Sequence, residues 1–315
     1  MDKIIIYGLG NAYEKIKDYL YKHYEVVACC DKNIKGNDII HPKLICTMEY
    51  DYIYITSSKY FAEISEELIN TYNVSKDKIL GVQNIFGDFR NEEIRDKWVI
   101  EKLLNIPKDK VILDAGAGES KYQKYCTHLK YIAQDFGEYI PNETITGMQF
   151  AQWDYSGINI KCDIIDIPLE DSSVDAILCT EVFEHISNPV LALKEFSRLL
   201  SVGGTLILTA PFCCLTHMAP YFFYNGFSDY WYEEHLKQSG FKIVDKVNYG
   251  SFFKYLQQEV LRLNEVCERY SKSAMTSEEL DTVWQVMKIL SKYAESDTGS
   301  DELLRFGTMI MAEKL

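Results

Sequence analysis

Val111-Ile-Leu-Asp-Ala-Gly-Ala-Gly-Glu-Ser120 is the stretch that decides the fold of this chain. It begins with an apolar run typical of a buried strand, which Asp114 and a glycine-rich turn follow. Gly116 and Gly118 allow a tight turn, and because they carry no side chain they let a ligand approach the backbone. We expect residues 122–129 to start a helix whose N-terminal amides face the same ligand.

Acidic residues follow later segments of the same half of the chain. Asp135 follows an expected second strand, Asp163 lies in a third short segment, and a further apolar run ends at Thr180-Glu181. This ordered series is more informative than the glycine pair alone, since a lone glycine pair after a strand is often only a turn.

Length and charge limit the class of protein. The 315 residues suffice for about two domains. Hydrophobic residues make up 47% and charged residues 25%, which is typical of a soluble globular protein. A net charge of −14 would repel a phosphate backbone and an anionic bilayer, so neither nucleic acid nor a membrane is an expected partner. The oligomeric state stays open, a homo-oligomer included.

The nine cysteines are scattered and form no CxxC pair, so we expect reduced thiols and no metal site. The N-terminus enters a strand directly and lacks the zones of a signal peptide. No run of about 18 apolar residues occurs. These observations predict a cytoplasmic protein.

Residues 1–88 are expected to form a small α/β domain, because short apolar strands alternate with helical segments. Gly8 and Gly10 fit the first two glycines of a dinucleotide fingerprint, and Asp31 stands where a ribose-binding acid belongs. Tyr13 occupies the third glycine position, where a bulky side chain opposes close packing. A structural or partner-docking role is therefore favoured, while a nicotinamide site or a site for another nucleotide stays open.

Residues 89–106 predict a linker helix that ends at Ile106-Pro107. Residues 107–315 are then expected to form the second domain. Within it, a helical insertion at 251–300 precedes a last strand, and its apolar stripe contains Leu256, Val260, Leu263 and Val266.

At this point the second domain resembles the class I S-adenosylmethionine-dependent methyltransferases of the small-molecule type, over residues 107–250 and the last strand. The resemblance rests on motifs that stand in the family's order: Asp114-Ala-Gly-Ala-Gly118, Asp135, Asp163-Ile-Ile-Asp-Ile-Pro168, Glu181-Val-Phe-Glu-His185 and Leu199-Leu-Ser-Val-Gly-Gly-Thr205. It implies a seven-stranded sheet whose last strand is antiparallel. The fold class is then α/β, with two Rossmann-like parallel sheets in tandem.

The resemblance also implies that S-adenosylmethionine is the cofactor. Gly116 and Gly118 would let the loop lie against its amino-acid part, and Asp114 would orient that loop and face the ammonium group. Ser120 stands where the family often has a third glycine, and it is small enough to fit.

The remaining cofactor contacts follow from the same resemblance. Asp135 would accept hydrogen bonds from both ribose hydroxyls. Asp163 would accept the adenine amino group, and the Ile164 amide would donate to a ring nitrogen. Thr180 and Glu181 would close the pocket. Taken singly, Asp135 could instead cap a helix and Asp163 could be a solvated loop acid.

His217 is the candidate general base, because imidazole titrates near neutral pH and the segment leaves the carboxyl end of the sheet. A backbone-bonded loop histidine is the competing interpretation. The aromatic stretch 221–232 is expected either to form a lid over an acceptor or to cover the sheet. His185 is expected to be packed or hydrogen-bonded.

The sequence therefore predicts methyl transfer from S-adenosylmethionine to a small-molecule acceptor, preferably at oxygen, and a sugar-linked or natural-product acceptor would fit. Two alternatives stay open. One is a cofactor-binding scaffold without catalysis, and the other is a nicotinamide-dependent oxidoreductase that works through the N-terminal domain. The sequence does not decide the acceptor atom.

Overall fold

The structure is a computed structural model that describes residues 1–34, 36, 38–57, 60–81, 84, 91–141, 147–148 and 152–315. It contains two compact units. The first comprises Met1–Arg90 and Phe253–Thr298, and the second comprises Asn91–Phe252 and Gly299–Leu315. No helix in the described part of the chain is long and apolar enough to cross a membrane.

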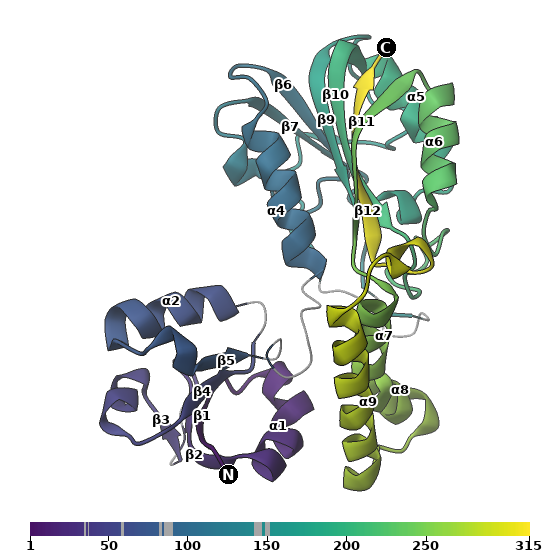
Figure 1. The fold of residues 1–315 in the computed structure, drawn as a ribbon. Coiled ribbons are helices and arrows are strands. Elements are labelled where there is room, and N and C mark those ends of the chain that lie inside the picture. Colours follow the sequence, from purple (N-terminus) through teal and green to yellow (C-terminus); the bar gives the residue numbers. More distant parts are fainter. Residues whose placement is uncertain are drawn as a thin grey trace. The chain divides into compact units, whose positions relative to one another are not determined.

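The first unit is built on a parallel five-stranded sheet of order β3-β2-β1-β4-β5 (Figure 1). That order is the one of the first five strands in a doubly wound nucleotide-binding sheet, as expected for residues 1–88. Its elements are β1 (Lys3–Tyr7), α1 (Asn11–His23), β2 (Glu25–Cys30), β3 (Ile39–Ile40), β4 (Tyr52–Ile55), α2 (Phe61–Tyr72) and β5 (Ile79–Gly81).

The expected helical segment near the C-terminus exists, but it packs on the first unit. Its elements are α7 (Phe252–Leu261), α8 (Leu263–Val266), a π-helical turn (Cys267–Ser271) and α9 (Ser277–Glu295). Trp284 and Met287 of α9 share a core cluster with Ile16 and Leu20 of α1. The prediction that this segment belongs to the second domain is therefore wrong, because an apolar helical face does not indicate which sheet it covers.

The second unit contains a seven-stranded sheet of order β11-β12-β10-β9-β6-β7-β8. Its last strand, β12, runs antiparallel to both neighbours and the other strands run parallel, which confirms the expected sheet. The strands are β6 (Val111–Ala115), β7 (Lys130–Asp135), β8 (Ile160–Lys161), β9 (Val174–Thr180), β10 (Leu200–Pro211), β11 (Phe241–Tyr249) and β12 (Gly307–Lys314).

Helices cover both faces of this sheet (Figure 1). The expected linker helix is α4 (Asn91–Leu104), which lies on one face and buries Trp98, Val99 and Leu103. On the other face lie α5 (Pro189–Leu199) and α6 (Asp229–Gln238). The sheet is thus enclosed, and its carboxyl edge is left to loops.

The helix predicted at residues 122–129 is not formed. Only a short 3-10 turn, Gln123–Tyr125, occurs there, and the chain continues through successive tight turns. Tyr122 is buried and its hydroxyl donates to Asp96 of α4 at 2.7 Å. Helix α4 packs against this turn and against β10 and β11.

Candidate functional site

The glycine turn and the acidic residues meet at the carboxyl edge of the second sheet. Strand β6 lies between β7 and β9, and Asp114 pairs in register with Ala133 on one side and Leu178 on the other. The loops that follow these strands therefore start at the same level. In open α/β sheets this edge is where ligands bind.

The two turn glycines cannot be replaced without strain. Gly116 has a φ of +77°, and a Cβ there would lie 2.5 Å from Cγ2 of Val182. Gly118 has a φ of +53°, and a Cβ would lie 2.8 Å from the ring of Trp153. Ser120 also has a positive φ, of 55°. The backbone of the glycine loop therefore lies in close contact with the side chains of Val182, which follows β9, and Trp153.

Asp135 orients this loop. Its carboxylate accepts hydrogen bonds from the amides of Gly118 at 2.9 Å and Gly137 at 2.7 Å, one on each oxygen. Only 9% of the residue is exposed. Each carboxylate oxygen has a second lone-pair direction, so the predicted bonds from ribose hydroxyls remain compatible with this geometry.

Asp114 is buried in the strand below the loop. Its carboxylate accepts a hydrogen bond from the hydroxyl of Tyr131 on β7 at 2.5 Å. Burial raises the pKa of Asp114 to about 7, the nearby Asp135 adds to that rise, and the Tyr131 bond opposes it. Asp114 thus links β6 to β7.

Asp163 and Ile164 follow β8, whose chain is joined to β7 by a hydrogen bond from the Cys162 amide to the Asp135 carbonyl at 3.2 Å. The Asp163 side chain is exposed and accepts a bond from the Ile165 amide at 3.2 Å. Ile164 is buried in the main core. The buried Ile164 therefore anchors the segment while the carboxylate of Asp163 faces solvent.

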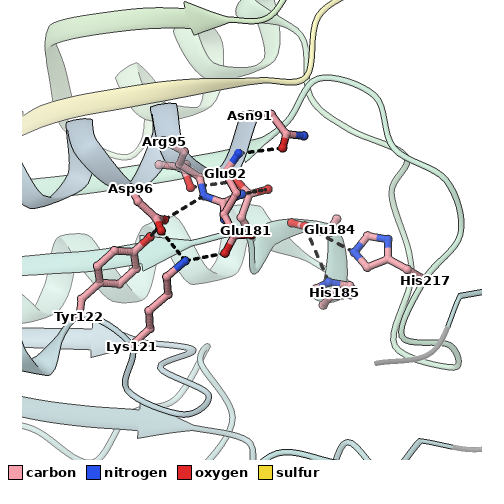
Figure 2. A network of polar contacts seen from close by, with 11 residues as sticks. Asn91, Glu92, Arg95, Asp96, Lys121, Tyr122, Glu181, Glu184, His185 and His217 are labelled. Atoms are coloured by element: carbon pink, nitrogen blue, oxygen red, sulfur yellow. Dashed lines mark hydrogen bonds and ion pairs between the residues drawn. The ribbon is translucent and has the colours of Figure 1, made fainter. Parts of the chain in front are cut away.

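Thr180 is the last residue of β9, and Glu181 follows it. Thr180 is half-buried, and Glu181 has a φ of +54°. One oxygen of Glu181 accepts from the Thr209 hydroxyl at 2.9 Å, and the other pairs with Arg95 of α4 at 3.0 Å (Figure 2). The carboxylate is thus used to hold the loop after β9 and the helix together.

The start of α4 is fastened to the glycine loop as well. Figure 2 shows Lys121 between Glu92 at 2.7 Å and Asp96 at 2.6 Å, next to the Tyr122 bond already described. The sequence pattern of α4 indicates only a linker helix. Its charged residues stand next to one another, and only the fold shows which loops they reach.

A second cluster joins Glu184, His185 and His217 (Figure 2). Glu184 is 1% exposed, and its Oε1 lies 3.7 Å from Nε2 of His185 and 3.9 Å from Nε2 of His217. The structure therefore places the predicted base beside a buried carboxylate and a second imidazole. No sequence pattern indicated this grouping, because His217 lies far from the other two along the chain.

Burial shifts the pKa values in this cluster. It raises the pKa of Glu184 well above its usual range, and the charge of Glu181 adds to the rise. Burial also lowers the pKa of His185 to about 4, so this imidazole is neutral at pH 7. Nδ1 of His185 lies 2.5 Å from the Tyr221 carbonyl, and Nδ1 of His217 lies 2.8 Å from the Leu215 carbonyl.

The aromatic stretch at 221–232 has two roles. Phe227 and Tyr232 belong to the buried core. The Phe222 ring lies 5.1 Å from the His217 ring, and the Tyr221 ring lies 5.7 Å from that of Phe136 beside Asp135. Its first residues therefore line the edge that carries the two clusters, and its later residues close the core.

The turn after β1 in the first unit is occupied by its own contacts. Asp31 accepts bonds from the amides of Leu9 at 2.9 Å, Asn33 at 2.8 Å and Ile34 at 3.0 Å. These bonds hold the pKa of Asp31 below its usual value despite burial, which acts in the other direction. Asp31 thus orders the turn after β1, as Asp135 orders the glycine loop of the second unit.

Comparison with known families agrees with the strand order of the second unit. Residues 113–208, which run from β6 to β10, match a family described as a methyltransferase domain. The second unit is a class I S-adenosylmethionine-dependent methyltransferase domain. Residues 1–80 match a family described as C2185-like, N-terminal.

Curated relatives match part of this methyltransferase domain. A probable S-adenosylmethionine-dependent methyltransferase of Mycobacterium tuberculosis is 26% identical over 32% of this chain and 35% of its own length. A methyltransferase-like protein of Schizosaccharomyces pombe is 30% identical over 35% of this chain and 41% of its own. The chain thus spans well under half the length of these relatives. A solved methyltransferase from Archaeoglobus fulgidus has 16% identity and a TM-score of 0.43, covering 74% of this chain and 97% of that one.

Proposed function

We propose that this protein transfers the methyl group of S-adenosylmethionine to an oxygen atom of a small-molecule acceptor. The observation that carries the proposal is the glycine loop bound to Asp135, with the open carboxylate of Asp163 on the adjoining segment. This arrangement offers backbone to the amino-acid part of the cofactor, an oriented carboxylate to the ribose and a second carboxylate to the adenine.

The cluster beyond the glycine loop supports an oxygen acceptor. In the reaction, the acceptor oxygen attacks the methyl carbon, the carbon–sulfur bond breaks, and its electron pair stays on the sulfur of S-adenosylhomocysteine. The sulfonium is already reactive and needs only to be aligned with the acceptor in a dry site. A hydroxyl acceptor must in addition lose its proton. His217, next to Glu184, is the group that we assign to receive that proton.

The wall around the cluster supports an acceptor with a flat or ring-shaped part. The ring of Phe222 lies beside both imidazoles, and the rings of Tyr221 and Phe136 contact each other next to Asp135. Sugars and natural products with hydroxyl groups pack on such faces and hydrogen-bond at their rims. All nine cysteines are free thiols, which fits a reducing compartment, and we place the reaction in the cytoplasm.

The test is a transfer assay with methyl-labelled S-adenosylmethionine and a panel of hydroxyl, amine and carbon acceptors. We expect label on hydroxyl acceptors, and we expect His217→Ala to lower turnover with little change in the affinity for S-adenosylhomocysteine. The matched control is His128→Ala, since that imidazole bonds only the Ile106 carbonyl among the contacts described for it.

Two outcomes would contradict the proposal. Label found only on nitrogen or carbon would exclude the oxygen acceptor. Cofactor binding without transfer to any member of the panel would favour the scaffold alternative.

A further inference from the structure

We propose that Glu184, His185 and His217 bind a divalent transition-metal ion. Each residue offers one ligand atom, and these atoms lie within 4.8 Å of one another. The three side chains converge from the turn after β9 and from the segment after β10 (Figure 2). Neither the predicted cofactor contacts nor the family match assigns an ion to this place.

The backbone fixes which imidazole nitrogen faces the cluster. Carbonyl oxygens only accept hydrogen bonds, so the Nδ1 atoms of His185 and His217 must carry the protons that reach the Tyr221 and Leu215 carbonyls. In a neutral imidazole the lone pair is then on Nε2, which is the atom closest to Glu184 in both residues. Metal-binding histidines are held in this way, with the second nitrogen bonded to a carbonyl or carboxylate.

The distances between Glu184 and the two imidazoles fit a shared metal ion better than hydrogen bonds. Separations of 3.7 and 3.9 Å from Oε1 of Glu184 are too long for hydrogen bonds. An ion with bonds of about 2.1 Å in a tetrahedral site holds neighbouring ligand atoms about 3.4 Å apart, and wider angles extend that distance. A contraction of a few tenths of an ångström would therefore bring Glu184 and each imidazole to this spacing.

Glu184 itself supplies an independent observation. Its side chain is 2% exposed, and its Oε2 has no hydrogen-bond partner among the residues that the structure describes. A buried carboxylate oxygen left in this state is costly unless a cation compensates it. Two imidazoles and one carboxylate suit Zn²⁺, Mn²⁺, Fe²⁺ or Co²⁺, whereas Mg²⁺ prefers oxygen ligands only.

The role of the ion rests on the proposed methyl transfer, although its binding does not. Three protein ligands leave a coordination position open for an acceptor hydroxyl, whose acidity rises on the ion, so that its proton passes to water. The oxygen then attacks the methyl carbon as described above. In the metal-bound protein His217 would be a ligand, and water would take the proton that we assign to His217 in the metal-free protein.

The experiment titrates the full-length protein, stripped with a chelator, with Co²⁺ in the absence of cofactor. We expect one ion per chain, with a visible spectrum that lacks a sulfur-to-cobalt charge-transfer band, because no cysteine is among the proposed ligands. Glu184→Gln preserves shape but loses the charged ligand, so affinity should fall by at least about 10–100-fold, the loss that even an outer partner of a ligand causes. The affinity of His217→Ala for Co²⁺ should fall by a similar factor.

His41→Ala, a histidine of the first unit that caps its own turn, is the matched control and should bind as the unaltered protein does. The proposal is overturned if the unaltered protein takes up no Co²⁺ from millimolar solution, if both variants bind as tightly as it does, or if the spectrum shows thiolate ligation. Binding of S-adenosylhomocysteine to the same variants is measured in parallel. A variant that loses Co²⁺ but still binds S-adenosylhomocysteine has lost only the metal site. Absent S-adenosylhomocysteine binding in the unaltered protein would instead count against the proposed function.

Discussion

Replacing Gly116 by alanine tests the packing of the glycine loop. The added Cβ would lie 2.5 Å and 2.7 Å from the two methyl carbons of Val182, and the backbone φ is +77°. Two costs follow, because an L-residue is strained in this conformation and because the new methyl group overlaps a side chain that is already packed.

The two costs can be estimated separately. The left-handed conformation costs a residue with a Cβ about 1–2 kcal/mol. Overpacking of a filled site costs about 1–3 kcal/mol. Gly116→Ala should therefore lower the free energy of unfolding of the second unit by about 2–5 kcal/mol.

Gly203 provides a matched control. Its φ is +76°, and a Cβ there would meet no atom within 4 Å in the described part of the chain. Gly203→Ala should therefore show the conformational cost alone. The double variant Gly116→Ala/Val182→Ala should recover the overlap term and keep the conformational one, so the two substitutions should be strongly non-additive.

Native-state hydrogen exchange of the β10 amides measures this free energy for the second unit without assuming that both units unfold together. The reasoning is refuted if Gly116→Ala costs no more than Gly203→Ala. It is also refuted if Val182→Ala gives no recovery in the double variant.

Three further changes probe other parts of the site. Asp163→Ala should leave stability unchanged, because the side chain is exposed, but weaken S-adenosylhomocysteine binding about tenfold by loss of one charged hydrogen bond; calorimetry should show no such loss for the exposed Glu170→Ala. Because burial raises the pKa of Asp114 to about 7, the folded state holds its proton more tightly than the unfolded state, and the free energy of unfolding should fall by up to about 4 kcal/mol between pH 4 and 7. Asp114→Asn should remove that part of the pH dependence. If denaturation curves of the variant give the same change of unfolding free energy with pH, Asp114 is not its source. Arg95→Met should unpair Glu181 and speed hydrogen exchange in α4, whereas unaltered protection would mean that the ion pair does not hold the helix.

The strands and the cofactor loop could be predicted because their signals are local. Runs such as Ile4-Ile-Ile6 and Val111-Ile-Leu113 are apolar and rich in β-branched residues, and a glycine turn follows each at a short distance. The positive φ values of Gly116 and Gly118 confirm the turn that the sequence indicated. Local chemistry was sufficient here because each residue acts on its neighbours in the chain.

The parts that the sequence did not predict depend on distant contacts. Residues 122–129 were expected to be helical, yet α4 packs there and binds Tyr122 through Asp96. The partner of the apolar face of α9 is α1 of the first unit, which helical periodicity alone cannot indicate. His217 gains its significance from Glu184, and only the path of the chain after β10 brings the two together.

The central claim is that the glycine loop and Asp135 hold S-adenosylmethionine at the carboxyl edge of the second sheet. Calorimetric titration of the full chain with S-adenosylhomocysteine tests it most directly, with Asp135→Ala measured beside it. We predict saturable binding to one site per chain, weakened by about 10–150-fold in the variant, since a charged hydrogen bond contributes about 1.5–3 kcal/mol. No heat of binding at millimolar ligand, or equal affinity in the variant, would contradict the claim.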